Sequence, residues 1–439
     1  MTAIQRRQML RASGLTVGAA GASRWFSPLA RALEADPQRK RRVILLWMAG
    51  GPSQTDTFDL KPGHENGGPF QEIQTPSADL RISEHLPGLA RMGDRLAVVR
   101  GLSTKEGDHS RGTQLMRTGH PPTPVTKHPA IGAALAKELT DAAAAIPGYV
   151  SIAPSQGFGG SGFGPGYLGP RYAPLYVTDG GSEYGPSAAS SGANGFALLK
   201  VESIQPADGI TAIQTAKRLE LWKQLQTRFV KDHPGASPLA HQTVYKSAVD
   251  LMQSDAATAF DLDQEDVETR TRYGKGAFGQ GCLMARRLIE QGVSFVEVSL
   301  GGWDTHSNNF EQIQELSGQL DAGWTSLMRD LDERGLLDLT TILWMGEFGR
   351  TPQINSQAGR DHFPQAWSCV FAGGGIEGGQ AYGRTSNDGR SVEDGKVGVT
   401  DVLATLCSAV GVDPRTMNQE PSGRPLPIVD GQAIQELLS

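Results

Sequence analysis

The sequence predicts an α/β fold: a mostly parallel central sheet with helices on both faces. Two observations support this class. Short apolar runs, typical of strands that are buried on both sides, recur along the chain. Amphipathic segments with helical periodicity lie between them, and strands that alternate with helices usually form parallel sheets. The chain has 439 residues, which is enough to bury such a core.

The predicted strands begin with the run RRVILLWMAGG near the start of the folded part. The others lie at 95–102, 147–152, 173–177, 292–300, 340–346 and 366–373. The predicted helices lie at 130–139, 213–229, 239–252, 278–291 and 310–336. Ligands of parallel sheets bind at the carboxyl ends of the strands, so polar residues that follow these runs are the candidates for a functional site.

The N-terminal residues predict export. Arg6 and Arg7 precede a weakly apolar stretch rich in Gly and Ala, which resembles a twin-arginine signal with Ala30-Arg31-Ala32 as a candidate cleavage site. The stretch is shorter than the ~20 apolar residues that cross a bilayer, so no transmembrane segment is predicted. A disordered basic N-terminus is the alternative. We assign residues 1–35 to the signal and 36–439 to one domain with a Gly/Ser-rich insertion at about 153–196, and we expect the protein in the periplasm or cell envelope.

Charge and cysteine content narrow the classes of partner. The formal net charge is −6 and there is no long basic run, which argues against binding to nucleic acid or to an anionic membrane surface. A small molecule, a glycan or a protein is the expected partner. Cys282, Cys369 and Cys407 are far apart and show no CxxC spacing, so we interpret them as buried small side chains. One disulfide is the alternative in an exported protein.

Two motifs combine carboxylate and imidazole side chains next to predicted strands. In GGWDTHSNN, which follows the strand at 292–300, the i,i+2 spacing lets Asp304 and His306 project to the same side of an extended segment. Nitrogen and carboxylate oxygen ligands suit zinc or a similar divalent ion. In GRDHFPQAW, Asp361 and His362 precede the strand at 366–373, and adjacent residues can face one ion only from a loop. A structural turn is the alternative.

Three further segments follow strands. Glu347 and Arg350 lie after the strand at 340–346, either as working groups or as a structural ion pair. The segments after the first two strands offer further candidates, for which a turn or a helix N-cap is the alternative. These candidates are Asp56, Asp108, His109, Ser110 and Arg111.

The segments GGPSQTDTFD, DHSRGTQLMRTG, GGWDTH, GEFGRTP and GRDHFP, in this order, resemble the alkaline phosphatase and sulfatase superfamily. More narrowly, they resemble an exported bacterial family of unknown function with a twin-arginine leader. The superfamily implies an alkaline phosphatase-like fold and sites for two metal ions. Asp304, His306 and His362 correspond to ligands of one ion. The other site departs from the pattern: Ala49-Gly50-Gly51 replace a strand-end Asp, Gly107 stands where a nucleophile is expected, and Glu347-Phe348 replace Asp-His.

The resemblance implies a metal-dependent hydrolase of phosphate or sulfate esters, acting on a small molecule or a glycan. The expected cofactor is one divalent ion, with zinc as the first candidate, bound by Asp304, His306 and His362. Asp56, Asp108, His109, Glu347 and Asp361 are weaker candidates for ligands. Arg111 or Arg350 would hold an anionic ester, and Ser110 and Glu347 complete the catalytic candidates. The alternative is a non-catalytic protein of the same fold that binds a glycan or a partner protein in the envelope.

Overall fold

The computed structural model describes residues 41–141, 144, 146–154, 162–178, 194–201, 204 and 209–439. These residues belong to one structural unit, which runs from Lys40 to Ser439. The predicted signal at 1–35 lies outside the described residues, as do 155–161 and 179–193 of the predicted Gly/Ser-rich insertion.

The central sheet has eight strands and is mostly parallel, as predicted. In spatial order they are β12 (Gln380–Tyr382), β4 (Leu96–Leu102), β11 (Trp367–Gly373), β8 (Thr340–Met345), β1 (Arg42–Met48), β7 (Phe295–Leu300), β5 (Tyr149–Ile152) and β6 (Leu175–Val177). The first strand of the chain, β1, lies in the middle and pairs in parallel with β7 and β8. Only β11 runs antiparallel to its neighbours β4 and β8 in this sheet of the described chain, and the sequence analysis did not foresee this reversal.

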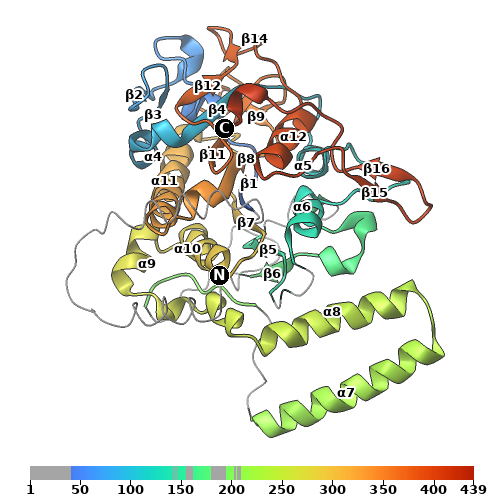
Figure 1. Cartoon of the computed structure of the whole chain (residues 1–439). Helices are drawn as coiled ribbons and strands as arrows, with labels where there is room; N and C mark the ends of the chain where they lie inside the picture. Colours follow the sequence, from blue (N-terminus) through green and yellow to red (C-terminus); the bar gives the residue numbers. More distant parts are fainter. Residues whose placement is uncertain are drawn as a thin grey trace, which may run out of the picture. The chain divides into compact units, whose positions relative to one another are not determined.

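Side chains of β1 alternate between two separate cores. Ile44, Leu46 and Met48 pack on one face, together with α10 (Ala277–Glu290) and α11 (Asn309–Glu333). Val43, Leu45 and Trp47 pack on the other face with residues of α6 (Ile131–Leu139) and α12 (Val399–Ala409). Figure 1 shows α10 and α11 on the left of the sheet and α6 and α12 on its right. Burial on both faces explains why β1 is a continuous apolar run rather than an alternating one.

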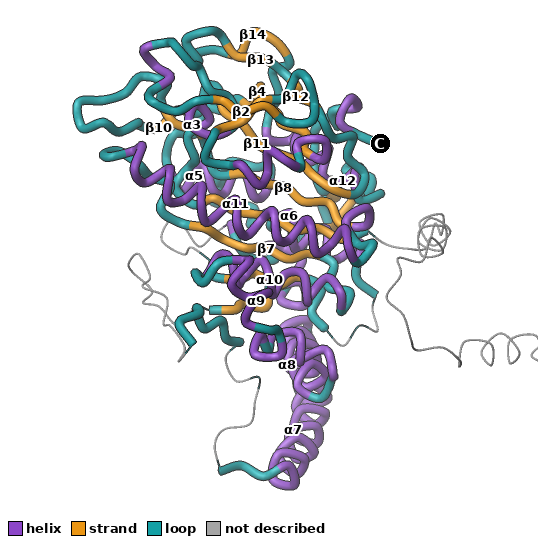
Figure 2. Tube along the Cα trace, turned by 90° about the vertical axis from the view of Figure 1, so that its left-hand side faces the viewer, coloured by secondary structure: helices purple, strands orange, loops and turns teal. Residues whose placement is uncertain are grey.

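The predicted strands and the five predicted helices are all present, with ends displaced by a few residues at most. The two helices not yet placed, α7 (Ala212–Asp232) and α8 (Ala236–Met252), run side by side as a hairpin (Figures 1 and 2). A capping box between Thr211 and Gln214 begins α7. None of the helices in the described part of the chain has the length and apolarity needed to cross a membrane.

Shorter elements complete the unit. The helices are α3 (Gln54–Thr57), α4 (Pro87–Arg91), α5 (His109–Thr118) and α9 (Val267–Tyr273), and the 3-10 turns are η1 (Glu65–Gly67), η2 (Gly93–Arg95), η5 (Gly166–Leu168), η6 (Pro170–Tyr172), η7 (Asp255–Phe260), η8 (Leu262–Gln264), η9 (Leu337–Leu339) and η10 (Gln435–Leu437). Two-stranded ladders pair β2 (Glu72–Gln74) with β3 (Arg81–Ser83), β9 (Gly349–Arg350) with β10 (His362–Phe363), β13 (Arg384–Thr385) with β14 (Val392–Asp394), and β15 (Met417–Gln419) with β16 (Pro425–Pro427).

The three cysteines are buried and free. The interpretation as buried small side chains is therefore confirmed, and the alternative of a disulfide is wrong for this structure. Burial raises the pKa of the Cys407 thiol to about 12, so the thiol stays protonated and unreactive at neutral pH.

Candidate metal centre

The motif residues meet at one edge of the sheet, beyond the carboxyl ends of β1, β4, β7 and β8. GGWDTHSNN follows β7, GEFGR follows β8, and α5 follows β4. His362 arrives differently, because it precedes β11 rather than following a strand. Since β11 is antiparallel, its amino end lies at the same edge, and the β9–β10 ladder places His362 opposite Arg350.

Asp304 lies at the centre of three imidazoles. Its Oδ2 is 3.3 Å from Nε2 of His109, and its Oδ1 is 3.2 Å from Nε2 of His362 and 3.0 Å from Nε2 of His306. The ligand atoms of His109, Asp304 and His362 all lie within 4.8 Å of one another, as in a group that could hold a metal ion. With Zn–N and Zn–O bonds of ~2.0–2.1 Å, ligand atoms of a tetrahedral site are separated by roughly 3.3 Å. The observed spacing is therefore compatible with one ion.

Each of the three imidazoles is held by its other ring nitrogen. Nδ1 of His109 lies 2.7 Å from Oε1 of Glu347, Nδ1 of His306 lies 2.7 Å from Oδ1 of Asp361, and Nδ1 of His362 lies 2.7 Å from the carbonyl oxygen of Gly107. All three partners are acceptors, so each Nδ1 carries the proton and donates it. Each Nε2 then faces Asp304 and can bind an ion once it carries no proton, which is the arrangement that orients metal-binding histidines in proteins.

The charges at this edge of the sheet favour a cation. Burial opposes protonation of His109, but its hydrogen bonds with Asp304 and Glu347 raise its pKa to about 9. Burial also opposes ionisation of Asp304, yet the hydrogen bonds from His109, His362 and Arg350 hold the pKa of Asp304 well below its usual range. The carboxylate is thus firmly ionised, and it stabilises positive charge beside it, either as a proton on His109 or as a metal ion that displaces this proton.

Glu347 supports His109 from below the surface. Its side chain is buried, and Oε1 also accepts a hydrogen bond of 2.9 Å from the backbone N–H of Gly50. Oε2 is buried and forms no hydrogen bond with any described residue. A buried carboxylate oxygen without a partner is costly, and a nearby cation offsets part of this cost. The residues present therefore fit a bound divalent ion.

Arg350 is fully buried and its donors are already used. Nη2 lies 2.5 Å from Oδ1 of Asp304, Nε donates to the carbonyl of Gly51 at 3.0 Å, and Nη1 donates to the carbonyl of Arg360 at 3.2 Å. The side-chain amide of Gln54 pairs with the backbone N–H and carbonyl of Arg350. Arg350 thus positions Asp304 and links three loops. No pair of guanidinium N–H groups remains to bind an ester in a bidentate manner.

The other sequence candidates lie outside this group or serve the helix. Asp108 is the N-cap of α5 and accepts a hydrogen bond from the backbone N–H of Arg111 at 3.0 Å, as the N-cap interpretation predicted. The side chain of Arg111 binds Glu106, and Ser110 is exposed on the first turn. Neither Ser110 nor Arg111 contacts Asp304 through any hydrogen bond or ion pair found in the described residues.

Asp56 forms a separate buried cluster. Arg360 binds it in a bidentate manner, at 2.7 Å to Oδ2 and 2.9 Å to Oδ1, and Asn309 donates to Oδ2 at 2.8 Å. The sequence analysis did not single out Arg360 or Asn309. Because the motifs GGPSQTDTFD, GRDHFP and GGWDTHSNN each contribute one of these residues, the cluster fixes the three loops relative to one another. Asp56 is thus a structural residue in this geometry.

Asp361 and Glu347, which the sequence offered as weaker ligands, accept hydrogen bonds from His306 and His109 in this structure. The reason for Asp361 was already visible, because adjacent residues on an extended segment point in opposite directions, so Asp361 and His362 cannot face one ion from a strand. His109 was ranked below His306, yet it is the more buried of the two, with its side chain 14% exposed against 45%.

Glycine and phenylalanine shape the rest of this edge. Gly50 has a φ of +113°, and a Cβ there would lie 2.4 Å from the backbone nitrogen of Asp304, so only glycine permits this approach of the two loops. The buried ring of Phe348 lies 4.5 Å from the ring of His362 and 5.0 Å from that of His109, centroid to centroid. Phe348 therefore packs against two of the imidazoles and offers no lone pair to an ion.

Fold and site together define an α/β protein with a His/Asp group able to bind a metal ion at the carboxyl edge of its sheet. The chain matches the family described as "Protein of unknown function (DUF1501)" over residues 40–438, and it belongs to this family. No curated protein matches the sequence at a significant level.

Solved structures with some likeness include a sulfatase, a lipoteichoic acid synthase and a phosphonate monoester hydrolase. The PsFucS1 sulfatase from Pseudoalteromonas sp. is 12% identical, with 88% of this chain and 70% of that chain covered and a TM-score of 0.40. The lipoteichoic acid synthase LtaP from Listeria monocytogenes is 9% identical, with 91% and 76% covered and a TM-score of 0.41. The phosphonate monoester hydrolase SpPMH from Silicibacter pomeroyi is 12% identical, with 90% and 76% covered and a TM-score of 0.39. These values are too low to assign an activity, so function has to be argued from the site.

Proposed function

We propose that the protein binds one divalent metal ion, with zinc as the first candidate, through His109, Asp304 and His362, with His306 beside them. The observation that supports this most directly is the shared orientation of the imidazoles: each Nδ1 is held by an acceptor and each Nε2 faces Asp304. A set of nitrogen and carboxylate oxygen donors suits zinc better than magnesium or calcium, which prefer oxygen ligands alone.

We further propose that the bound ion supports hydrolysis of a phosphate or sulfate ester, on a small molecule or a glycan. When bound, such an ion acts as a Lewis acid and makes a water molecule acidic enough to attack without a protein nucleophile. Asp304 and His306 are 34% and 45% exposed at their side chains, so an ion beside them would be reachable from solvent. The order of the motifs, which resembles the alkaline phosphatase and sulfatase superfamily, supports the same class of reaction.

A non-catalytic binding protein is the second candidate function, and specific residues favour it. Gly107 stands where the resemblance places a nucleophile, and a side chain built there would meet only Pro364, at 3.7 Å. Space for a nucleophile is therefore present, but the nucleophile is not. Phe348 and the Ala49-Gly50-Gly51 segment lack the ligands of a second ion. Such a protein would use the metal centre to hold a glycan or a partner protein in the envelope.

The test combines metal analysis with activity. Purified protein should contain close to one equivalent of a divalent metal, and the metal-loaded protein should hydrolyse 4-nitrophenyl phosphate or 4-nitrophenyl sulfate. The matched variant is His362→Ala, which should lose both. One equivalent of metal without hydrolysis of either ester would favour the binding protein, and absence of metal would refute the centre itself.

Export is a separate proposal, supported by Arg6 and Arg7 ahead of a short, weakly apolar stretch. Replacing both arginines with lysine should leave the protein in the cytoplasm, as seen by cell fractionation. Unchanged export of this variant would contradict the twin-arginine assignment.

A further inference from the structure

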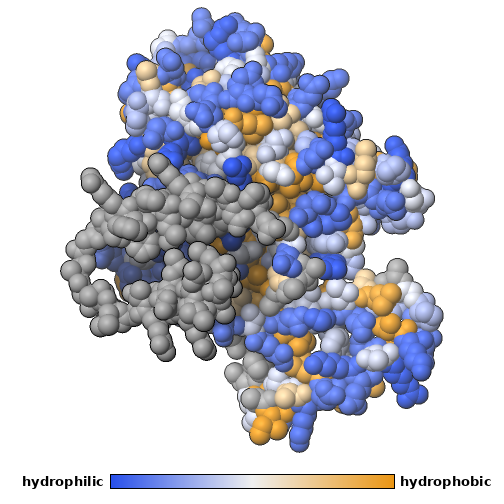
Figure 3. Space-filling view, viewed as in Figure 1, coloured by the Kyte–Doolittle hydropathy of each residue, from blue (hydrophilic) through white to orange (hydrophobic). Residues whose placement is uncertain are grey.

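The hairpin of α7 and α8 carries a stripe of exposed apolar side chains. Leu221, Leu225 and Phe229 are 57%, 60% and 49% exposed. Because they are spaced four residues apart, they lie along one side of α7. Single exposed apolar side chains are common on proteins, but a contiguous stripe usually marks a contact surface. Apolar side chains interrupt the hydrophilic surface of the hairpin in Figure 3.

An aromatic pair extends this surface onto the second helix. Trp222, next to the stripe, stacks on Tyr245 of α8, with ring centroids 5.5 Å apart and an interplanar angle of 19°. Tyr245 is 46% exposed. Tryptophan and tyrosine rings are enriched at the level of lipid headgroups, because their bodies are apolar and their edges polar.

The charge of the hairpin differs from that of the whole chain. The whole chain has a formal net charge of −6, whereas on the hairpin Lys and Arg outnumber Asp and Glu. The basic ones are Lys217, Arg218, Lys223, Arg228, Lys231 and Lys246, and the acidic ones are Glu220, Asp232 and Asp250. At 100° per residue, Arg218 falls between Leu225 and Phe229 around the helix, and Arg228 falls beside Leu221. The composition argument against an anionic membrane surface therefore does not apply to this part of the chain.

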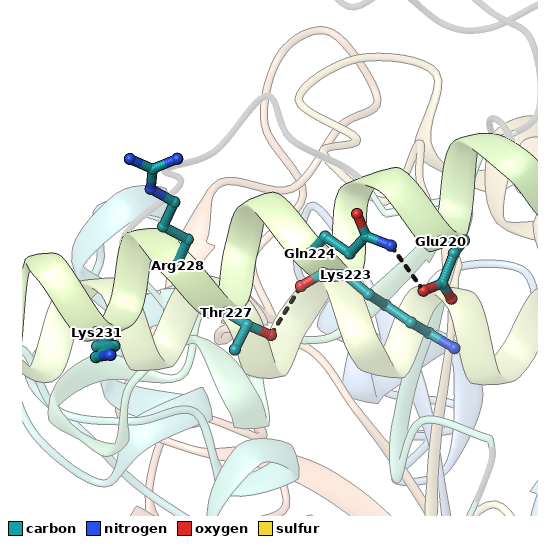
Figure 4. A pocket seen from close by; sticks show the side chains of 6 residues that line it. All are labelled: Glu220, Lys223, Gln224, Thr227, Arg228 and Lys231. Carbon is teal, nitrogen blue, oxygen red and sulfur yellow. Dashed lines mark hydrogen bonds between the residues drawn. The ribbon is translucent and has the colours of Figure 1, made fainter.

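The opposite side of α7 is polar. Figure 4 shows Glu220, Lys223, Gln224, Thr227 and Lys231 around a shallow hollow on this helix, together with Arg228, which lies where the hollow borders the stripe. Gln224 donates to Glu220 at 3.1 Å, and Thr227 donates to the carbonyl of Lys223 at 2.8 Å, so some of these polar groups bind one another. A helix with Leu, Trp and Phe on one side, basic side chains within and beside this apolar stripe, and polar residues on the opposite side is typical of helices that lie in a membrane interface.

We propose that the α7–α8 hairpin binds the surface of a bilayer that contains anionic lipids. Leu221, Leu225 and Phe229 would enter the headgroup region, while the basic side chains beside them reach the lipid phosphates. A second copy of the chain fits less well, because two copies of a surface with an excess of basic side chains repel each other, whereas anionic lipid attracts both. This proposal does not depend on the metal centre.

The test uses the full chain and vesicles of phosphatidylcholine, with or without phosphatidylglycerol, in a sedimentation assay. The chain should bind the phosphatidylglycerol vesicles, and added salt should weaken the binding. The variant Leu221→Ser/Leu225→Ser/Phe229→Ser should bind at least ~10-fold more weakly. The control variant, Val125→Ser/Val267→Ser/Met417→Ser, removes side chains that are 86%, 66% and 61% exposed elsewhere, and it should bind like the parent.

Circular dichroism should show that both triple variants keep the helical content of the parent. Equal binding by the hairpin variant and the parent would overturn the proposal, as would binding that is the same with and without phosphatidylglycerol. Light scattering without lipid tests whether the hairpin instead binds a second copy of the chain. A parent that is dimeric, a hairpin variant that is monomeric and a lack of vesicle binding would together identify a self-association surface.

Discussion

Asp56 and Asp304 differ in a way that separates a structural carboxylate from a candidate metal ligand. Both follow a buried strand of the parallel sheet, and both contact an arginine. Asp56 is fully buried and surrounded by donors, from Arg360 and Asn309. Asp304 is partly exposed and faces the Nε2 atoms of three imidazoles whose Nδ1 atoms donate to other partners. The neighbours, rather than the carboxylate or its place after a strand, decide which aspartate can bind a metal.

The largest expected effect is loss of the metal. His362→Ala should reduce the metal content from about one equivalent to near zero, because it removes a proposed ligand, and His306→Ala should lower the metal content, because it removes an Nε2 beside the ion. Ser110→Ala is the control, since Ser110 is exposed and should leave the content unchanged. Elemental analysis of the purified variants measures this. Two tightly bound equivalents in the parent, or full metal in both histidine variants, would return Asp304 and His306 to the role of a structural turn.

The next effect concerns stability at the other aspartate. Asp56→Asn should lower the free energy of unfolding by about 3–5 kcal/mol, because it leaves the buried guanidinium of Arg360 without its charge partner. Denaturant unfolding of metal-free protein measures the loss. Asp304→Asn, studied in the same way, should cost less stability while abolishing metal binding. The distinction would fail if the two variants lost the same amount of stability, or if both lost metal binding.

A smaller effect is expected at Glu347. Glu347→Gln should weaken metal binding by about 10–100-fold, because an amide orients the Nδ1–H of His109 less firmly than a carboxylate does. Competition with a chelator of known affinity measures the change. Glu297→Gln is the matched control, since Glu297 is equally buried but contacts Arg117 and Tyr149 instead. The same loss of affinity in both variants would show a general effect of buried charge.

The smallest effect is expected at Asp361. Asp361→Asn should weaken metal binding by about 10-fold or less, because its side chain is 55% exposed and water can replace part of the hydrogen bond to His306. The control is Asp338→Asn, which alters a carboxylate of similar exposure, 58%, that pairs with Arg95. If metal affinity fell more in Asp361→Asn than in Glu347→Gln, Asp361 rather than Glu347 would be the more important of the two carboxylates that hold histidines.

The sequence predicted the elements of the fold well because their periodicity was strong. The continuous apolar runs of β1, β7 and β8 are short and end in polar or Gly-containing motifs, which is typical of buried strands in a chain with helices between them. The reversal of β11 was not predictable, since strand direction depends on pairing and leaves no trace in an apolar run. In the same way, Asp304, His306 and His362 could be selected by spacing, whereas the contact of His109 with Glu347 joins residues 238 positions apart.

Side-chain roles were harder to predict than side-chain positions. Asp56, Asp304 and Asp361 have the same chemistry and occupy similar places in the motifs. Their partners come from other parts of the chain: Asp56 binds Arg360, Asp304 faces imidazoles, and Asp361 binds His306. Whether a carboxylate is a candidate metal ligand, a hydrogen-bond acceptor for a histidine or part of a buried ion pair depends on contacts that only the folded chain makes.

The antiparallel course of β11 also has a consequence for the order in which the centre assembles. Because the chain returns through the β9–β10 ladder before it enters β11, Arg350 and His362 become neighbours through local pairing, and His362 lies only 58 positions from Asp304. His109 depends on closing a loop of 238 residues to Glu347, which is slow compared with local pairing. We therefore expect refolding to form the half made by Asp304, His306 and His362 first, with His109 joining last. Stopped-flow refolding with cobalt as a spectroscopic probe should then show weak early capture of the ion followed by a slower gain in affinity, and His109→Ala should abolish only the second phase.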